Sequence, residues 1–207
     1  MGESPDANAK GFAVRSLRRG IALALPVGAT AADVVSKSKF SVSDEGWGLA
    51  GVTATPSPVH RSSGGNPGGY IRVEDGNAET APGQTDMYFV APAKFLGDRR
   101  SSYGTDLSFD LRQSDAGPIQ CGDDADVTLS GAGLTVERNI KKPSEAPNWG
   151  HYDVLLRASL WVIDGGGEPS REQMRDVLGS LETMRIKAEY RCGPEVTGLD
   201  SVVLRSR

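Results

Sequence analysis

Asp106-Leu107-Ser108-Phe109-Asp110-Leu111-Arg112 is the stretch of the sequence that decides the fold. Its apolar residues alternate strictly with polar ones, which is typical of a β-strand with one face on a core and the other in water. Further short runs rich in β-formers, separated by turn residues, cover 39–42, 70–73, 86–90, 126–130, 134–138, 151–156, 185–190 and 201–204. Strands at this spacing predict an all-β jelly-roll β-sandwich.

Length and composition agree with one β-rich domain. The chain has 207 residues, of which 26 are glycine and 12 proline, and these interrupt almost every apolar run. No apolar run approaches the roughly 20 residues that span a bilayer, so we expect no membrane insertion. The formal net charge of −4 argues against nucleic acid as the partner.

One short amphipathic helix is predicted near residue 170. Ser170 and Gln173 have the spacing of a capping box. Met174, Val177, Leu178 and Leu181 then recur at the spacing of one helical face. We expect this helix to lie over an edge or an open end of the sandwich.

The first residues differ from the rest of the chain. Three arginines (Arg15, Arg18 and Arg19) precede a short apolar stretch and then the small residues Ala29-Thr30-Ala31. This order is that of a secretory leader, so residues 1–36 are predicted to be leader and linker and residues 37–207 the domain. The protein would then be secreted, either extracellular or periplasmic. The alternative is an N-terminal arm that stays in place.

The two cysteines, Cys121 and Cys192, fit an exported protein. Neither has the spacing of a zinc or thioredoxin-type motif. With two cysteines only one intrachain disulfide is possible, and we predict that it forms. Two unrelated thiols are the alternative.

No catalytic motif stands out. His60 and His151 are the only histidines in the sequence and neither has a recognisable catalytic or metal-binding partner, and no GxSxG motif is present. Three adjacent acid pairs, Asp44-Glu45, Glu74-Asp75 and Asp123-Asp124, lie in turn-like contexts. We expect no enzyme. A polysaccharide hydrolase that uses paired carboxylates is the alternative.

Several stretches together make the family recognisable. They include Phe40-Ser-Val-Ser-Asp-Glu-Gly-Trp47, Gly65-Asn-Pro-Gly-Gly-Tyr-Ile71 and Tyr88-Phe-Val-Ala-Pro-Ala-Lys-Phe-Leu-Gly-Asp98. The chain resembles the laminin IV type A module, also called the laminin B domain, over roughly residues 38–205. The resemblance implies a jelly roll similar to galactose-binding and carbohydrate-binding modules and an extracellular, non-enzymatic role. Two cysteines are too few for epidermal-growth-factor-like repeats, so we expect a stand-alone, bacterial version.

A second similarity suggests calcium. Carbohydrate-binding jelly rolls hold a structural calcium with an early acid and a late aspartate, and the matching positions here are Asp44 or Glu45 and Asp200. Calcium takes six to eight oxygen ligands, so backbone carbonyls would complete such a site. The alternative is that all three are ordinary turn acids.

The aromatic residues suggest where a ligand would bind. We expect Trp47 and Trp161 in the core and predict a ligand site among Tyr103, Asn148, Trp149 and His151. The predicted function is an extracellular binding or adhesion module for a glycan or a matrix protein. A purely structural adhesion module is a further alternative.

Overall fold

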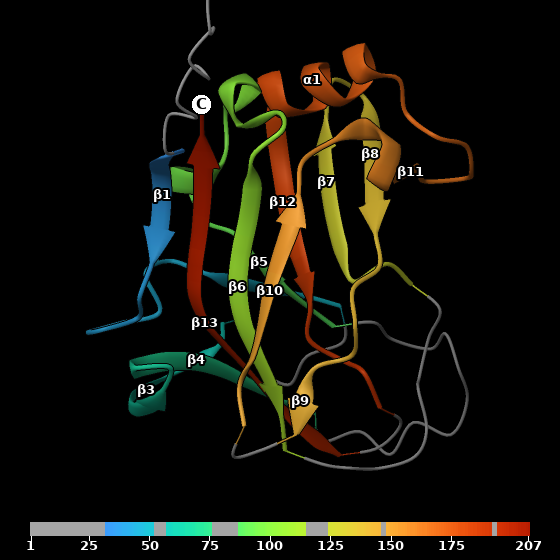
Figure 1. Cartoon of the computed structure of the whole chain (residues 1–207). Coiled ribbons are helices and arrows are strands. Elements are labelled where there is room, and N and C mark those ends of the chain that lie inside the picture. Colours follow the sequence, from blue (N-terminus) through green and yellow to red (C-terminus); the bar gives the residue numbers. More distant parts are fainter. Residues whose placement is uncertain (1–31, 52–56, 76–86, 115–123, 146–147, 192–193) are drawn as a thin grey trace, which may run out of the picture.

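Two β-sheets packed face to face form the protein (Figure 1). The computed structural model describes residues 32–51, 57–75, 87–114, 124–145, 148–191 and 194–207. Within these ranges the strands pair antiparallel except for one short parallel pair, β6 with β9. The predicted all-β jelly-roll sandwich is therefore confirmed.

The first sheet is built around the long C-terminal strand. Its order is β10 (Gly150–Leu155), β6 (Asp106–Gln113), β13 (Glu195–Ser206), β4 (Gly68–Asp75) and β3 (Val59–Gly65). β9 (Ser144–Glu145) pairs with the end of β6, and β1 (Asp33–Ser38) pairs with the second half of β13. The beginning and the end of the described chain are therefore hydrogen-bonded to each other. β1 starts inside the range 1–36 that was predicted to be leader and linker; the leader itself, residues 1–31, lies outside the described residues and stays a prediction.

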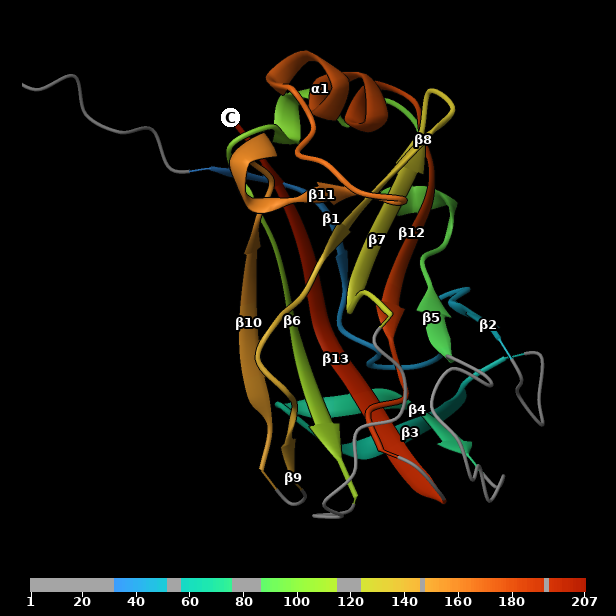
Figure 2. The ribbon, with the colours of Figure 1, turned by 90° about the vertical axis from the view of Figure 1, so that its right-hand side faces the viewer.

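The second sheet packs beside the first in the side view, where β7, β12 and β5 lie to the right of β6 and β13 (Figure 2). Its order is β11 (Val162–Ile163), β8 (Leu134–Arg138), β7 (Val127–Gly131), β12 (Leu181–Lys187), β5 (Tyr88–Val90) and β2 (Gly48–Ala50). β7 and β8 form the hairpin that the glycines around Ala132 predict.

The core fills the space between the sheets with the apolar faces of both. Leu107, Phe109 and Leu111 of β6 are fully buried, as their alternation predicts. Trp47 and Trp161 are 1% and 2% exposed, which confirms both as core residues. Trp47 packs edge-on against Phe95 at 5.5 Å between ring centres, and its Nε1 donates to Ser38 Oγ at 2.9 Å. An indole N–H inside a core needs such a partner.

The predicted helix is α1 (Arg171–Gly179), and it closes one end of the sandwich (Figure 1). Both bonds of its capping box are present: Ser170 Oγ accepts from Gln173 N, and the Gln173 side chain accepts from Ser170 N. Met174, Val177 and Leu178 are buried against the sheets. Leu181 belongs to β12 instead of the helix. The short 3-10 turns η1 (Ala93–Phe95), η2 (Arg100–Ser102) and η3 (Ala158–Leu160) complete the described elements.

Two predictions about strands are wrong. Residues 39–42 form a turn, because Phe40 has a left-handed backbone with φ of 49° and the Glu45 carboxylate accepts its N–H at 2.6 Å. The polar face of β6 is not in water at its centre. Ser108 and Asp110 are 1% and 3% exposed. The Arg205 side chain donates to Ser108 Oγ, and the Asn66 side chain donates to Asp110 Oδ2.

The capping box gives a first testable prediction. Ser170→Ala removes the acceptor for the Gln173 N–H, so we expect the free energy of unfolding to fall by about 1 kcal/mol. Urea denaturation followed by circular dichroism measures it. Ser41→Ala, an exposed serine in a turn, is the control and should change it by less than about 0.5 kcal/mol. Equal losses in both variants would contradict the structural role of the cap.

Candidate functional site on the first sheet

Two aspartates lie directly opposite each other on neighbouring strands of the first sheet. Asp110 of β6 is paired in register with Asp200 of β13, and both belong to the face turned away from the core. Asp110 is 3% exposed and Asp200 is 0% exposed. Like charges opposite each other destabilise a sheet, and burial increases the cost. Hydrogen-bond donors must therefore surround this pair.

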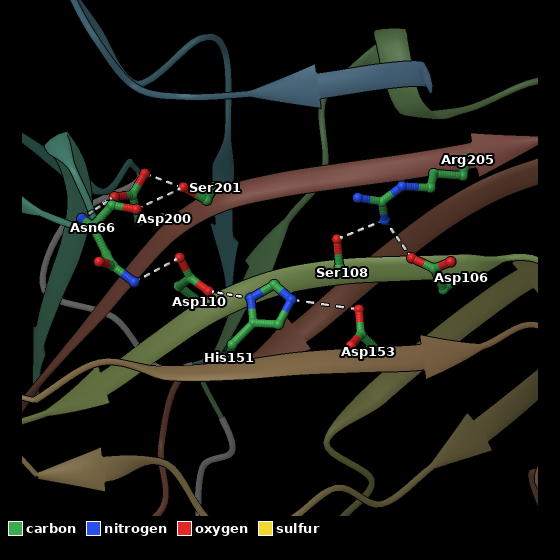
Figure 3. A network of polar contacts seen from close by, with 9 residues as sticks. All are labelled: Asn66, Asp106, Ser108, Asp110, His151, Asp153, Asp200, Ser201 and Arg205. Atoms are coloured by element: carbon green, nitrogen blue, oxygen red, sulfur yellow. Dashed lines mark hydrogen bonds and ion pairs between the residues drawn. The ribbon is translucent and has the colours of Figure 1, made fainter. Parts of the chain in front are cut away.

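The turn between β3 and β4 supplies two of these donors (Figure 3). Asn66 donates its backbone N–H to Asp200 Oδ2 at 2.5 Å and its side-chain amide to Asp110 Oδ2 at 3.2 Å. Its carbonyl accepts from Ser201 Oγ at 3.2 Å. Gly65 beside it has no room for a side chain, because a Cβ there would lie 2.5 Å from Asp200 Oδ2. The glycine-rich turn is thus docked onto the polar face.

His151 of β10 completes the network from the other side. Its Nδ1 donates to Asp110 Oδ1 at 2.5 Å, and its Nε2 lies 3.4 Å from Asp153 Oδ1. The side chains of His151 and Asp153 are 56% and 66% exposed. The imidazole therefore connects a buried carboxylate to one in solvent. The expectation that His151 lacks an orienting partner is wrong, because the partner comes from a strand distant in the sequence.

The electrostatics of the network favour bound protons. Burial, with the neighbouring Asp110 carboxylate adding to it, raises the pKa of Asp200 from 3.8 to about 6. The hydrogen bond to Asp110 raises the pKa of His151 above its usual 6.5. Both groups bind protons more tightly in the folded state. The bound proton of each group therefore stabilises the folded state fully at a pH below the pKa that the group has in the unfolded chain. This stabilisation is lost as the pH rises through the pKa of the folded state.

An aromatic group lies beside the carboxylates on the same face. The rings of Tyr70 and Trp149 meet edge-on at 5.4 Å, and the Arg112 guanidinium lies 4.7 Å and 4.6 Å from their centres. Trp149 Nε1 donates to Gly64 O at 3.2 Å. Gly198 of β13 forms the floor, where a Cβ would come within 3.0 Å of the indole. Trp149 is half-buried.

A hollow of about 320 Å³ lies next to this face, along the free edge of β10. Its polar lining includes His151, Asp153, Arg138, Asn139 and Lys141. β10 is the outermost strand of its sheet in the described structure. Trp149 directly precedes β10, and His151 and Asp153 of β10 line the hollow. We call the outer side of this strand, with Trp149 and the hollow, the β10 face.

The predicted ligand residues divide into two places. Trp149 and His151 lie on the β10 face, and Asn148, exposed, is adjacent to Trp149 in the chain. Tyr103 follows η2, at the end of the sandwich that α1 covers. The sequence patterns do not predict Asp110, Asn66 or Arg112 as residues of the site. The alternation of β6 placed Asp110 and Arg112 on the polar face, but no local signal shows that a distant turn docks there.

The predicted calcium ligands have separate partners. Glu45 accepts from Lys39 N and Phe40 N and pairs with Lys94, whereas Asp200 accepts from Asn66 N and Ser201 N. In the ranges that the structure describes, no three His, Cys, Asp or Glu side chains gather as a metal site would require. Asp44, the third predicted ligand, accepts from Gly46 N. Calcium binding by Asp44 or Glu45 with Asp200 stays a prediction.

The predicted disulfide lies outside the described residues, because Cys121 and Cys192 both fall there. Asp123 of the third acid pair does so as well. The disulfide stays a prediction, which non-reducing mass spectrometry of linked peptides would test.

The fold makes this protein a β-sandwich module with aromatic and polar side chains on the outer face of its first sheet. The family is shown by the match of its sequence. The family model Laminin B (Domain IV) matches residues 88–206, which is more than half of the chain. The chain belongs to this family, and the resemblance seen in the sequence is confirmed. Its stand-alone and bacterial character stays a prediction.

Individual relatives agree with this assignment. Human laminin subunit gamma-2 is 52% identical over 127 residues, which cover 58% of this chain and 10% of that protein. The basement membrane proteoglycan of Caenorhabditis elegans is 30% identical over 118 residues, 57% of this chain and 3% of that protein. The chain thus spans a small part of these relatives. The L4b domain of human laminin alpha-2 has the same fold, with a TM-score of 0.52 at 16% identity over 58% of this chain and 70% of that domain.

The buried carboxylate gives a prediction about pH. Relative to Asp200→Asn, the wild type should lose stability as the pH rises from about 4 to about 6, because only the folded state resists ionisation of Asp200. Two pKa units at about 1.4 kcal/mol each correspond to roughly 3 kcal/mol. Urea unfolding of both proteins at pH 4, 5, 6 and 7 measures the difference.

The control is Glu182→Gln, which neutralises an exposed carboxylate on β12. Its stability should follow that of the wild type at every pH. If the free energies of unfolding of the wild type and Asp200→Asn differ by the same amount at every pH from 4 to 7, Asp200 has an ordinary pKa in the folded protein.

Proposed function

We propose that this domain is an extracellular, non-catalytic binding module that recognises an uncharged glycan on the β10 face. The observation that carries the proposal is the half-buried Trp149, which Tyr70, Arg112 and Gly64 hold in a fixed orientation. It directly precedes β10, the strand that lines a polar hollow. Sugars present apolar C–H faces and many hydroxyls, so they suit a preformed aromatic ring with a few polar groups around it.

The polar groups of the β10 face suit hydroxyls better than charges. His151, Asp153 and Asn139 supply both donors and acceptors at the hollow. The surface also mixes acidic and basic side chains, since Arg138 and Lys141 line it together with Asp153. A mixed surface of this kind gives no strong preference for either sign of charge, whereas each group can bond a hydroxyl.

The same geometry speaks against hydrolysis. A glycosidase needs two carboxyl groups at the scissile bond. Asp110 and Asp200 are the closely paired acids of this face, but the docked turn covers them and leaves 3% and 0% of each residue exposed. Of the acid pairs noted in the sequence, Glu45 pairs with Lys94 and Glu74 with Arg72. Both glutamates are thus paired with a cation.

The extracellular location rests on the family. Its relatives include a basement membrane proteoglycan and laminin subunits. In the part of the chain that the structure describes, no helix has the length and apolar character to cross a membrane. Detection of the protein in a cell-free culture fraction of its host would support this location.

Binding to an array of neutral oligosaccharides tests the proposed function. Trp149→Ala should weaken binding of the best neutral glycan at least tenfold, because the loss of one stacking ring costs more than about 1.4 kcal/mol. Isothermal titration measures the Kd. Val162→Ala, an exposed apolar residue on the second sheet, is the control and should leave the Kd unchanged.

Two results would contradict the proposal. One is the absence of any neutral glycan that depends on Trp149, which would favour a purely structural adhesion module. The other is release of reducing ends from a polysaccharide that stops in the Asp123→Asn/Asp124→Asn variant, which would favour the hydrolase alternative.

A further inference from the structure

A second surface at the other end of the sandwich gathers arginines. Arg171 and Arg175 lie on one side of α1, Arg100 is in η2, and Arg207 ends the chain after β13. Together with Tyr103 and Asp98 they line a hollow of about 570 Å³, which we call the arginine pocket. Figure 1 shows the C-terminus beside α1 at this end. Residues from three distant parts of the chain thus form one basic site.

Packing fixes the arrangement of these side chains. The Arg100 guanidinium lies so close against Gly179 of α1 that a Cβ at this position would collide with it. Arg207 donates to Gly104 O at 3.2 Å. The Arg171 guanidinium lies 5.6 Å from the centre of the Tyr103 ring. The pocket is therefore preformed, with an aromatic ring in its wall.

The four guanidinium groups of the pocket outnumber the acids among the described residues that line it. In the described residues no ion pair joins Arg100, Arg171, Arg175 or Arg207 to a carboxylate. Asp98 is the acid in the lining, and its Oδ1 accepts from the backbone N–H of Arg100 at 3.0 Å. Four guanidinium groups that repel one another around a single hollow favour an anionic ligand.

The basic surface continues beyond the pocket. A hollow of about 240 Å³ on the other side of Tyr103 adds Arg157 and shares Arg171 and Arg207. Another, of about 390 Å³, shares Arg171 and Arg175 and includes Glu172. A single small anion would occupy only one of these hollows. A chain with anions at regular intervals would use all of them.

The chemistry of the site indicates which anionic chain fits. Guanidinium forks match the paired oxygens of sulfate and carboxylate groups. The Tyr103 ring offers an apolar surface to a sugar between such groups. The whole chain has a net charge of −4, which disfavours long-range attraction of any polyanion, so recognition has to come from the pocket itself. Whether the pocket also accepts a nucleic acid is decided by the DNA control below.

From these observations we infer that the arginine pocket binds a sulfated polysaccharide, at a site separate from the β10 face. The sulfate groups bond the guanidiniums of Arg100, Arg171, Arg175 and Arg207, and a sugar ring packs against Tyr103. Binding weakens with rising salt, because the contacts are ionic and partly exposed.

Dextran sulfate and unsulfated dextran of equal length are the probes. The protein should bind dextran sulfate, and not dextran, in isothermal titration at 0.1 M salt. Arg171→Gln/Arg207→Gln should weaken that binding at least tenfold. Arg61→Gln/Arg185→Gln removes the same charge from exposed positions outside the pocket and should change the Kd by less than about threefold.

Folding and geometry need separate checks. Arg171→Gln/Arg207→Gln should keep the circular dichroism spectrum and the cooperative thermal transition of the wild type, because both side chains lie outside the core. Arg171→Lys/Arg207→Lys keeps the charge and loses the fork, so its affinity should lie between those of the wild type and the Gln variant. If Arg171→Lys/Arg207→Lys binds dextran sulfate as tightly as the wild type does, the two guanidinium groups do not bond sulfate in a bidentate way.

Other outcomes overturn the inference as a whole. Equal losses in the pocket and control variants would mean that net charge alone drives binding. Equal affinity for a DNA duplex at the same salt would mean a nucleic-acid site. Trp149→Ala should bind dextran sulfate like the wild type, so this test succeeds or fails independently of the proposed neutral glycan.

Discussion

The two buried carboxylates of Asp110 and Asp200 are the constraint on which the polar face of the first sheet depends. Two acids in register on neighbouring strands repel each other, and burial removes the water that would screen them. Asn66 offsets this cost with two donors, one for each carboxylate. The turn between β3 and β4 therefore has to dock where it does. Without this turn, Asp110 and Asp200 would lose the Asn66 donors and would repel each other at the surface of the first sheet.

That docking also fixes the aromatic group. Gly64, one residue before the tight contact at Gly65, accepts the bond from the Trp149 indole. The same turn thus covers the acids and orients the ring that we assign to ligand binding. His151 connects the two parts, since it bonds Asp110 and also lines the hollow beside β10. A change in protonation of the network would accordingly reach the binding surface through His151.

The sequence predicts the features that local patterns determine, such as the faces of strands and the cap of a helix. It does not predict contacts between distant segments. The alternation of β6 correctly places Leu107, Phe109 and Leu111 in the core, and the spacing of Ser170 and Gln173 correctly predicts the capping box. Alternation identifies the polar face of a strand but not the segment that packs on it, so the burial of Asp110 could not be foreseen. Arg100, Arg171 and Arg207 meet only through the tertiary fold. No spacing between them indicates a shared site.

The two surfaces differ in charge, and they lie toward opposite ends of the sandwich (Figure 1). The C-terminal segment takes part in both. Asp200 of β13 belongs to the buried network, and Arg207, the residue after β13, lines the arginine pocket. A sulfated chain is attracted by the arginines of the pocket, whereas the mixed charges of the β10 face give it no net attraction. One ligand chemistry therefore does not suit both sites. A module that holds a neutral glycan at one end and a sulfated one at the other would join two components of a matrix, which requires a rigid sandwich and no catalysis.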